Sequence, residues 1–205
     1  SVQIQRGLGS TSLAVPSAGG TVSVNTRAAE VDPGSGIKMS IGDNSYQKFT
    51  AFHNTGVNEL GWSSSFLLGF WQGDGWRNGM QGEGTTYAFS VGYTPRGSDH
   101  EFNFSLIGAG QWHHQAYYGT QLQDYLDYGP IQGDDYRKFN ALYGDYQGEE
   151  FSILRNYYNK PLATFNWDWE ISSRVTLATS LYGSAGRGGG TGLRGRGSYG
   201  VSPFR

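Results

Sequence analysis

The stretch Leu60-Gly-Trp-Ser-Ser-Ser-Phe-Leu-Leu-Gly-Phe-Trp-Gln72 decides the fold class, because bulky and small side chains alternate along it. The bulky positions are Trp62, Phe66, Leu68 and Phe70, and between them lie Ser63, Ser65 and Gly69. A period of two residues is that of a β-strand with one apolar and one polar face. The pattern therefore predicts a strand over residues 60–72.

The same alternation recurs on both sides of this stretch and predicts an all-β chain of antiparallel strands. We expect further strands over residues 2–5, 21–26, 37–41, 46–56, 85–94, 101–110, 162–171 and 175–182. Turn-forming residues such as Asp32-Pro33-Gly34 separate them. Residues 111 to about 157 are rich in Tyr, Asp, Gln and Gly and break the alternation, which predicts a long loop.

The lengths of the expected connections also alternate. Those at 57–59, 95–98 and 172–173 are short, those at 73–84 and 111–157 are long, and the one at 43–45 is an exception. Short turns at one end and long loops at the other are typical of an up-and-down β-barrel in an outer membrane. A soluble sandwich would place Lys and Glu on its polar faces, whereas here that face is mostly Gly, Ala, Ser, Thr and Asn.

Composition narrows the class of protein further. The 205 residues include 33 glycines and 15% aromatics, and only 16% are charged, against about 25% in soluble domains. The mean hydropathy is −0.51, which suits barrel strands because lipid-facing and lumen-facing residues alternate. A net charge of −2 gives no basic field for nucleic acid, and the absence of cysteine excludes disulfides and thiolate metal sites.

The N-terminal residues carry a family resemblance. Val2-Gln-Ile-Gln-Arg-Gly7, a small-residue loop and Gly19-Gly-Thr-Val-Ser-Val-Asn25 resemble the end of the plug domain of TonB-dependent outer-membrane receptors. Further stretches are similar to receptors of the Bacteroidota type, in order along the chain: Asp43–Tyr46, Asn54–Gly56, Gly73–Arg77, Gln111–Gln115, Tyr157–Pro161 and Gly186–Gly192.

The resemblance implies a domain organisation and a function. Residues 1–30 would be the end of the plug, and residues 31–205 would be about seven strands of a transmembrane barrel that has about 22 strands in this family. The chain would then be a fragment of a longer protein. The implied activity is active import of a siderophore, oligosaccharide or peptide across the outer membrane, driven by a TonB-type energy-coupling protein that contacts a region before residue 1. Outer-membrane lipids are the implied surroundings, and a SusD-like surface lipoprotein is left open as a further partner.

The candidate site residues fall into two groups. Aromatic and amide side chains in the expected long loop suit a polar nutrient, or alternatively pack the loop itself. They are Trp112, His113, His114, Tyr117, Tyr118 and Tyr125, with Tyr128, Tyr136 and Tyr143 nearby. The resemblance implies that Arg6, together with Arg27, holds the plug against acidic residues of the barrel wall.

Other chemistry is disfavoured by the pattern. His113-His114 has no carboxylate at ligand spacing, so no metal site is expected. Asp168 and Glu170, about 6.6 Å apart on one strand face, are more simply lumen residues than a glycosidase pair. We therefore expect neither an enzyme nor a cofactor. Two rivals stay open: a structural or glycan-binding surface β-protein, and a passive porin.

Overall fold

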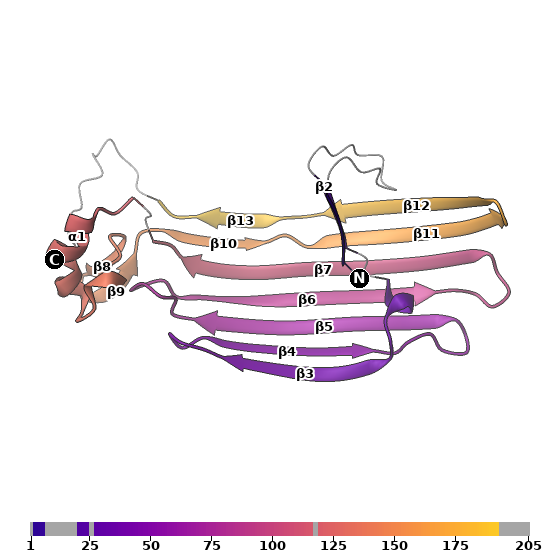
Figure 1. Cartoon of the computed structure of the whole chain (residues 1–205), viewed down its shortest axis with the longest axis horizontal. Helices are drawn as coiled ribbons and strands as arrows, with labels where there is room; N and C mark the ends of the chain where they lie inside the picture. The colour runs from indigo at the N-terminus through magenta and orange to yellow at the C-terminus, as the bar shows by residue number, and fades with distance from the viewer. Residues whose placement is uncertain (1, 7–19, 25–26, 117–118, 193–205) are drawn as a thin grey trace.

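The computed structural model describes residues 2–6, 20–24, 27–116 and 119–192, with side chains from Arg27 onward. One antiparallel sheet contains most of them, and its strands follow one another as hairpins (Figure 1). The all-β prediction is confirmed. The strands are β3 (Gly34–Ile41), β4 (Gln47–Asn54), β5 (Trp62–Gly73), β6 (Gly82–Tyr93), β7 (His100–His114), β10 (Arg155–Asn159), β11 (Leu162–Ser172), β12 (Val175–Ser184) and β13 (Arg187–Gly190).

Two rows of the sheet are each formed by two consecutive strands with a short break between them. β10 and β11 both pair with β7, and they are separated by Lys160 and Pro161. β13 pairs with β10 as β12 pairs with β11. The sheet is open in the part of the chain that the structure describes, with β3 at one edge and β12 and β13 at the other.

The N-terminal strands lie outside this sheet. β1 (Val2–Arg6) and β2 (Gly20–Val24) form a hairpin of their own, in which Val2 pairs with Val24 and Arg6 with Gly20. Both strands were expected from their alternation. A short 3-10 helix, η1 (Ala28–Glu30), precedes β3.

The two faces of the sheet differ sharply in chemistry. Residues that pair directly across antiparallel strands share a face, and the register therefore assigns every strand position. The apolar face carries Met39, Phe49, Phe66, Leu68, Phe70, Phe89, Val91, Phe104, Leu106, Phe165 and Leu181. The polar face carries mainly polar and small residues, which are Lys38, Thr50, Ser63, Ser65, Gly69, Ser90, Gly92, Glu101, Asn103, Ser105, Thr164, Asn166, Asp168 and Ser180, and its large apolar residues include Phe52, Leu67 and Ile107.

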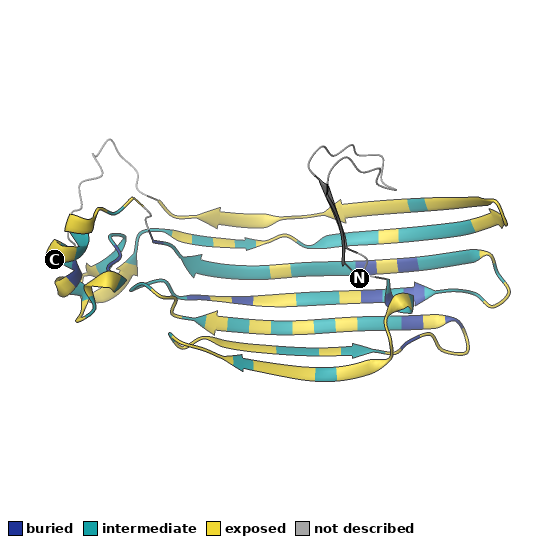
Figure 2. Ribbon diagram, viewed as in Figure 1, coloured by how far each residue is buried: buried dark blue, intermediate teal, exposed yellow. Residues whose placement is uncertain are grey.

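Burial is the reverse of that in a soluble sheet. Large side chains on the apolar face are exposed, with Ile37 at 72% and Leu68 at 58%. Polar residues are buried in the half of β5, β6 and β7 that lies beneath η1 (Figure 2), whereas Gly82 and Gly84 are buried at the opposite end of β6. Ser63, Asn103 and Ser105 are each at most 3% exposed.

The connections separate into two ends, as expected. Residues 55–61, 94–99 and 173–174 form the short-turn end, where η1 also lies. Residues 42–46, 74–81 and the described residues of 115–154 form the long-loop end. The first of these is tight because Asn44 and Ser45 both take φ of 56°, which lets the Gly42 N–H donate to the Tyr46 carbonyl at 2.9 Å.

The predicted loop over residues 111–157 is wrong at both boundaries. Residues 111–114 continue β7, because Gly82–Gly84 and Arg155–Tyr158 supply strand partners on either side. Between them lies a folded cap of four elements: α1 (Leu122–Gln132), η2 (Tyr136–Lys138), β8 (Tyr143–Tyr146) and β9 (Glu149–Ser152). The strand partners are distant in sequence, so local alternation does not reveal them.

Candidate functional site

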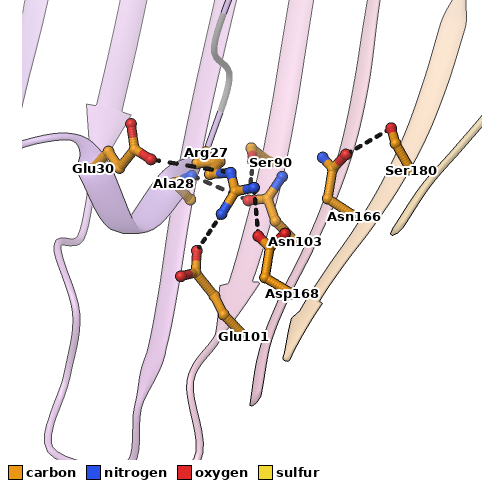
Figure 3. Close-up of polar contacts among 9 residues, drawn as sticks. All are labelled: Arg27, Ala28, Glu30, Ser90, Glu101, Asn103, Asn166, Asp168 and Ser180. Carbon is orange, nitrogen blue, oxygen red and sulfur yellow. Dashed lines mark hydrogen bonds and ion pairs between the residues drawn. The ribbon is translucent and has the colours of Figure 1, made fainter. Parts of the chain in front are cut away.

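The polar face is the candidate functional surface, and its best-defined contact centres on Arg27 (Figure 3). Glu101 of β7 and Asp168 of β11 lie directly opposite each other in the register. Two carboxylates in such a pair repel each other. The Arg27 guanidinium contacts both, with Nη1 3.1 Å from Glu101 Oε1 and Nη2 2.5 Å from Asp168 Oδ2.

The contact is partly shielded from water. The side chains of Arg27, Glu101 and Asp168 are 25%, 34% and 21% exposed. Burial alone would lower the pKa of Arg27, but the hydrogen bond and charge of Asp168, followed by those of Glu101, raise it above its ordinary value. Glu30 adds a weak contact at 4.0 Å from the same guanidinium. Arg27 therefore stays charged at any physiological pH.

A second contact holds the neighbouring backbone. The Ala28 N–H donates to Asn103 Oδ1 at 3.2 Å, and Ser90 Oγ donates to the same oxygen at 3.1 Å. Ala28 is fully buried and Asn103 is 2% exposed. Gly92 leaves the space that the Ser63 side chain needs, because a Cβ at this position would lie 2.5 Å from Ser63 Oγ.

Towards the long-loop end, another row of residues crosses the polar face. The register aligns Lys48, Trp71, Gly84, Gln111 and Tyr158 on five adjacent strands. A Cβ at Gly84 would lie 2.5 Å from Trp71 Nε1, so the indole lies over this glycine. Lys160 approaches the Tyr158 ring, with Nζ 5.8 Å from the centroid. Aromatic faces, an amide and ammonium groups thus lie side by side at the same level.

The cap is attached to the 74–81 loop by partly buried hydrogen bonds. Asn140, which is 1% exposed, donates from Nδ2 to the Asn78 carbonyl at 2.9 Å, and the Asn78 N–H donates to the Lys138 carbonyl at 2.9 Å. Gln132 joins the same network, since its Nε2 donates to the carbonyls of Asn140 and Tyr143. The two longest described loops therefore form one unit.

Tyr143 and Glu150 connect the two strands of the cap hairpin. Burial raises the pKa of Tyr143 to about 12, and its hydrogen bond with Glu150 adds to the effect. The tyrosine also packs over Gly79, where a Cβ would lie 2.0 Å from the Tyr143 ring. Tyr143 is therefore a structural residue of the cap.

The predicted ligand residues do not lie together. Trp112 and His114 share the apolar face with Phe104, whereas His113 lies on the polar face opposite Asn156. Tyr125 of α1 packs edge-on against buried Phe139, at 5.8 Å between ring centroids. Tyr117 and Tyr118 lie outside the described residues.

Of the two arginines expected to hold the plug, Arg27 makes ion pairs with sheet residues. Arg6 ends β1, and its side chain lies outside the described part of the structure. Trp71 and Tyr158 also lie on the polar face and were not among the predicted site residues. The alternation of the strand could have identified Trp71, because Trp71 occupies an odd-numbered position of the same strand as Ser63, Ser65 and Gly69.

No group of three or more His, Asp or Glu side chains is arranged to hold a metal ion in the described part of the chain. None of its helices is both long enough and apolar enough to cross a membrane.

A scan against models of protein families and searches of curated proteins and of solved structures find no match to this chain. The geometry of the sheet and of the Arg27 contact is therefore the basis for assigning a function.

Proposed function

We propose that this chain is part of a TonB-dependent transporter that imports a nutrient across the outer membrane. In this proposal the sheet is a section of the barrel wall, its apolar face meets lipid, and its polar face lines the lumen. The observation that carries the proposal is that the segment around Arg27 lies on the polar face while the apolar face is left exposed. Further strands would pair with β3 and with β12 and β13 to close the wall.

The exposed apolar face suits hydrocarbon. Soluble monomers rarely expose contiguous apolar patches larger than a few hundred Å². Here exposed large side chains run across the sheet from β3 to β12, including Met39 at 76%, Phe66 at 41% and Leu181 at 62%. Across the strands of the sheet, the charged residues of this face are Glu83, Arg155 and Arg187, and all of them lie towards the long-loop end.

Aromatic side chains bound this face at two levels. At the short-turn end Trp62 stacks on Tyr93 at 4.3 Å, and Trp167 stacks on Trp169 at 6.3 Å. At the other end Trp112 pairs with Tyr157. The ten residue-to-residue steps from Phe102 to Trp112 span about 33 Å of strand, which a tilt of about 40° reduces to the height of about 25 Å typical of an outer-membrane apolar band.

The polar face suits a plugged lumen better than an open pore. The Arg27 segment is attached to it by ion pairs and by Asn103, and Ala28 is the buried apolar residue of η1. Beneath it, Ser63 Oγ and Asn103 Nδ2 have no hydrogen-bond partner among the described residues. An interface of partly satisfied polar groups is cheaper to separate than an apolar core. It is therefore suited to a segment that moves when the coupling protein pulls on the plug.

The row through Trp71, Gln111 and Tyr158 is the ligand-contact surface in this proposal. Its stacking faces and hydrogen-bonding groups are suited to a polar nutrient. The cap above it would limit access from outside the cell.

Labelling of single cysteines tests the assignment of the faces, because the chain has no cysteine of its own. Leu68→Cys lies on the apolar face and Ala109→Cys on the polar face, at mid-height of neighbouring parts of the sheet. In outer membranes, a membrane-impermeant maleimide that enters the lumen should label Ala109→Cys and leave Leu68→Cys unmodified. Equal labelling would place water on both faces and favour the rival soluble or adhesive β-protein.

A further inference from the structure

A cluster of side chains at the long-loop border of the apolar face has no role in the proposed transport. It contains Trp112 of β7, Arg155 of β10 and Glu83 of β6, which the register places on one face at adjacent levels. The Arg155 guanidinium lies over the Trp112 ring, with Cζ 4.4 Å from the ring centroid. The Trp112 indole N–H donates to Glu83 Oε1 at 2.8 Å, which fixes the plane of the ring.

The backbone of Arg155 is held by two hydrogen bonds with Thr191. Its N–H donates to Thr191 Oγ1 at 2.8 Å, and its carbonyl accepts from the Thr191 N–H at 2.8 Å. Stacking occupies the flat face of a guanidinium and leaves its edge directed outward, with N–H groups in a fork that matches two oxygens of a phosphate. The residue is exposed.

The charged residues of the apolar face differ between the long-loop end and the short-turn end. A second arginine, Arg187, lies on the same face of the neighbouring strand, opposite Asn159. Arg187 lies at the level of Asn159, four residues along β10 from Arg155, and with Glu83 engaged by Trp112 this part of the apolar face carries two cations and one anion. At the short-turn border, the outward strand positions carry Trp62, Tyr93, His100 and Trp169.

We propose that Arg155, stacked on Trp112, binds the phosphate of an anionic lipid headgroup in the leaflet on the long-loop side, with Arg187 as a second contact. The inference rests on the proposed membrane location, because the border of the apolar face is then the level of the headgroups. Arginine and tryptophan are both suited to that level, where an apolar body meets polar headgroups. The ligand is a phosphorylated membrane lipid rather than free phosphate, because the site opens sideways from the sheet.

The test uses the protein that contains this chain, reconstituted in phosphatidylcholine vesicles with spin-labelled phosphatidylglycerol or spin-labelled phosphatidylcholine. We expect a preference for phosphatidylglycerol of about fivefold per arginine, which Arg155→Gln reduces by about that factor. Arg155→Lys should recover part of it, since charge is kept and the fork is lost. Lys38→Gln, on the polar face and away from lipid in this proposal, is the matched control and should change nothing.

A failure of the lipid inference can be distinguished from a failure of the proposed function. A protein that inserts, as judged by heat-modifiable gel mobility, but shows no preference or an unchanged preference in Arg155→Gln would overturn this inference alone. A protein that does not insert into either vesicle would overturn the proposed function as well. Inorganic phosphate that competes equally with the lipid would show that the cluster is a general anion site and not a lipid site.

Discussion

Glu101 and Asp168 lie directly opposite each other on β7 and β11, and Arg27 from outside the sheet contacts both carboxylates. One guanidinium thus offsets the repulsion between two strand neighbours. The relationship joins three segments that are far apart in the chain.

The first prediction concerns this contact. Arg27→Met should leave two partly buried carboxylates facing each other and loosen η1 from the sheet by about 1–2 kcal/mol, a value reduced by their partial exposure to water. Hydrogen exchange at Ala28–Val31 measures the opening. Glu30→Gln is the control, since its contact is 4.0 Å long and its side chain is 49% exposed. If Arg27→Met and Glu30→Gln behave alike, the ion pairs do not hold the segment.

Asn103 supports the same segment through a neutral hydrogen bond. Asn103→Ala should leave the buried Ala28 N–H without its acceptor and destabilise the η1 contact by about 1–3 kcal/mol. Faster exchange of the Ala28 amide is the measurement. Asn166→Ala, one strand away and bonded to exposed Ser180, should leave that amide protected. Equal protection in both variants would contradict the role of Asn103.

The cap depends on Phe139, which is 3% exposed between Tyr125 and Tyr128. Phe139→Ala should cost about 3–5 kcal/mol and open the cap without disturbing the sheet. Limited proteolysis would then cleave within residues 119–154 while heat-modifiable mobility is retained. Ile131→Ala, at a position 69% exposed, serves as the control. Resistance of Phe139→Ala to cleavage would show that the cap has another source of stability.

Tyr143 gives the cap a dependence on alkaline pH. Its pKa is about 12 in the folded protein and about 10 in an unfolded chain, so the neutral phenol stabilises the cap. This stability is fully present below pH 10 and is lost as pH rises from 10 to 12. Cap proteolysis should therefore accelerate over that window in the wild type and less steeply in Tyr143→Phe. Parallel pH curves would exclude a contribution from this group.

The orientation of two tryptophans can be measured by quenching. Trp112 lies on the apolar face and Trp71 on the polar face. In vesicles, Trp112→Phe should remove part of the quenching by brominated lipid, and Trp71→Phe should remove part of the quenching by iodide. The reverse result would exchange the two faces and contradict the transport proposal.

Local sequence was sufficient for the strands and insufficient for the cap. Alternation predicted β5 and β6 well, because period two is a property of a single strand. It missed the end of β7 at His114, where pairing with β6 and β10 outweighs a local pattern of His and Gln. It also missed α1, whose Tyr residues, Gly129 and Pro130 are poor helix formers. That helix is held by contacts such as Tyr125 with Phe139.

The candidate site was predictable only in part for a related reason. Which face a residue occupies follows from parity, so Trp71 was within reach of the sequence. Which residues lie at the same level depends on register between strands, and register placed Trp71, Gln111 and Tyr158 in one row. The partners of Arg27 required the same information, since Glu101 is 74 residues away in the chain.

The separation of those partners also has a consequence for the order of assembly. Glu101 and Asp168 come together only when β7 and β11 have paired, which closes a loop that contains the whole cap. Loop closure of this kind is a slow, late step in the folding of β-proteins. The two carboxylates that Arg27 contacts are therefore not both in place until this part of the sheet has formed. The segment that precedes the sheet in the chain would then be the last to pack onto it, after β7 and β11 have paired.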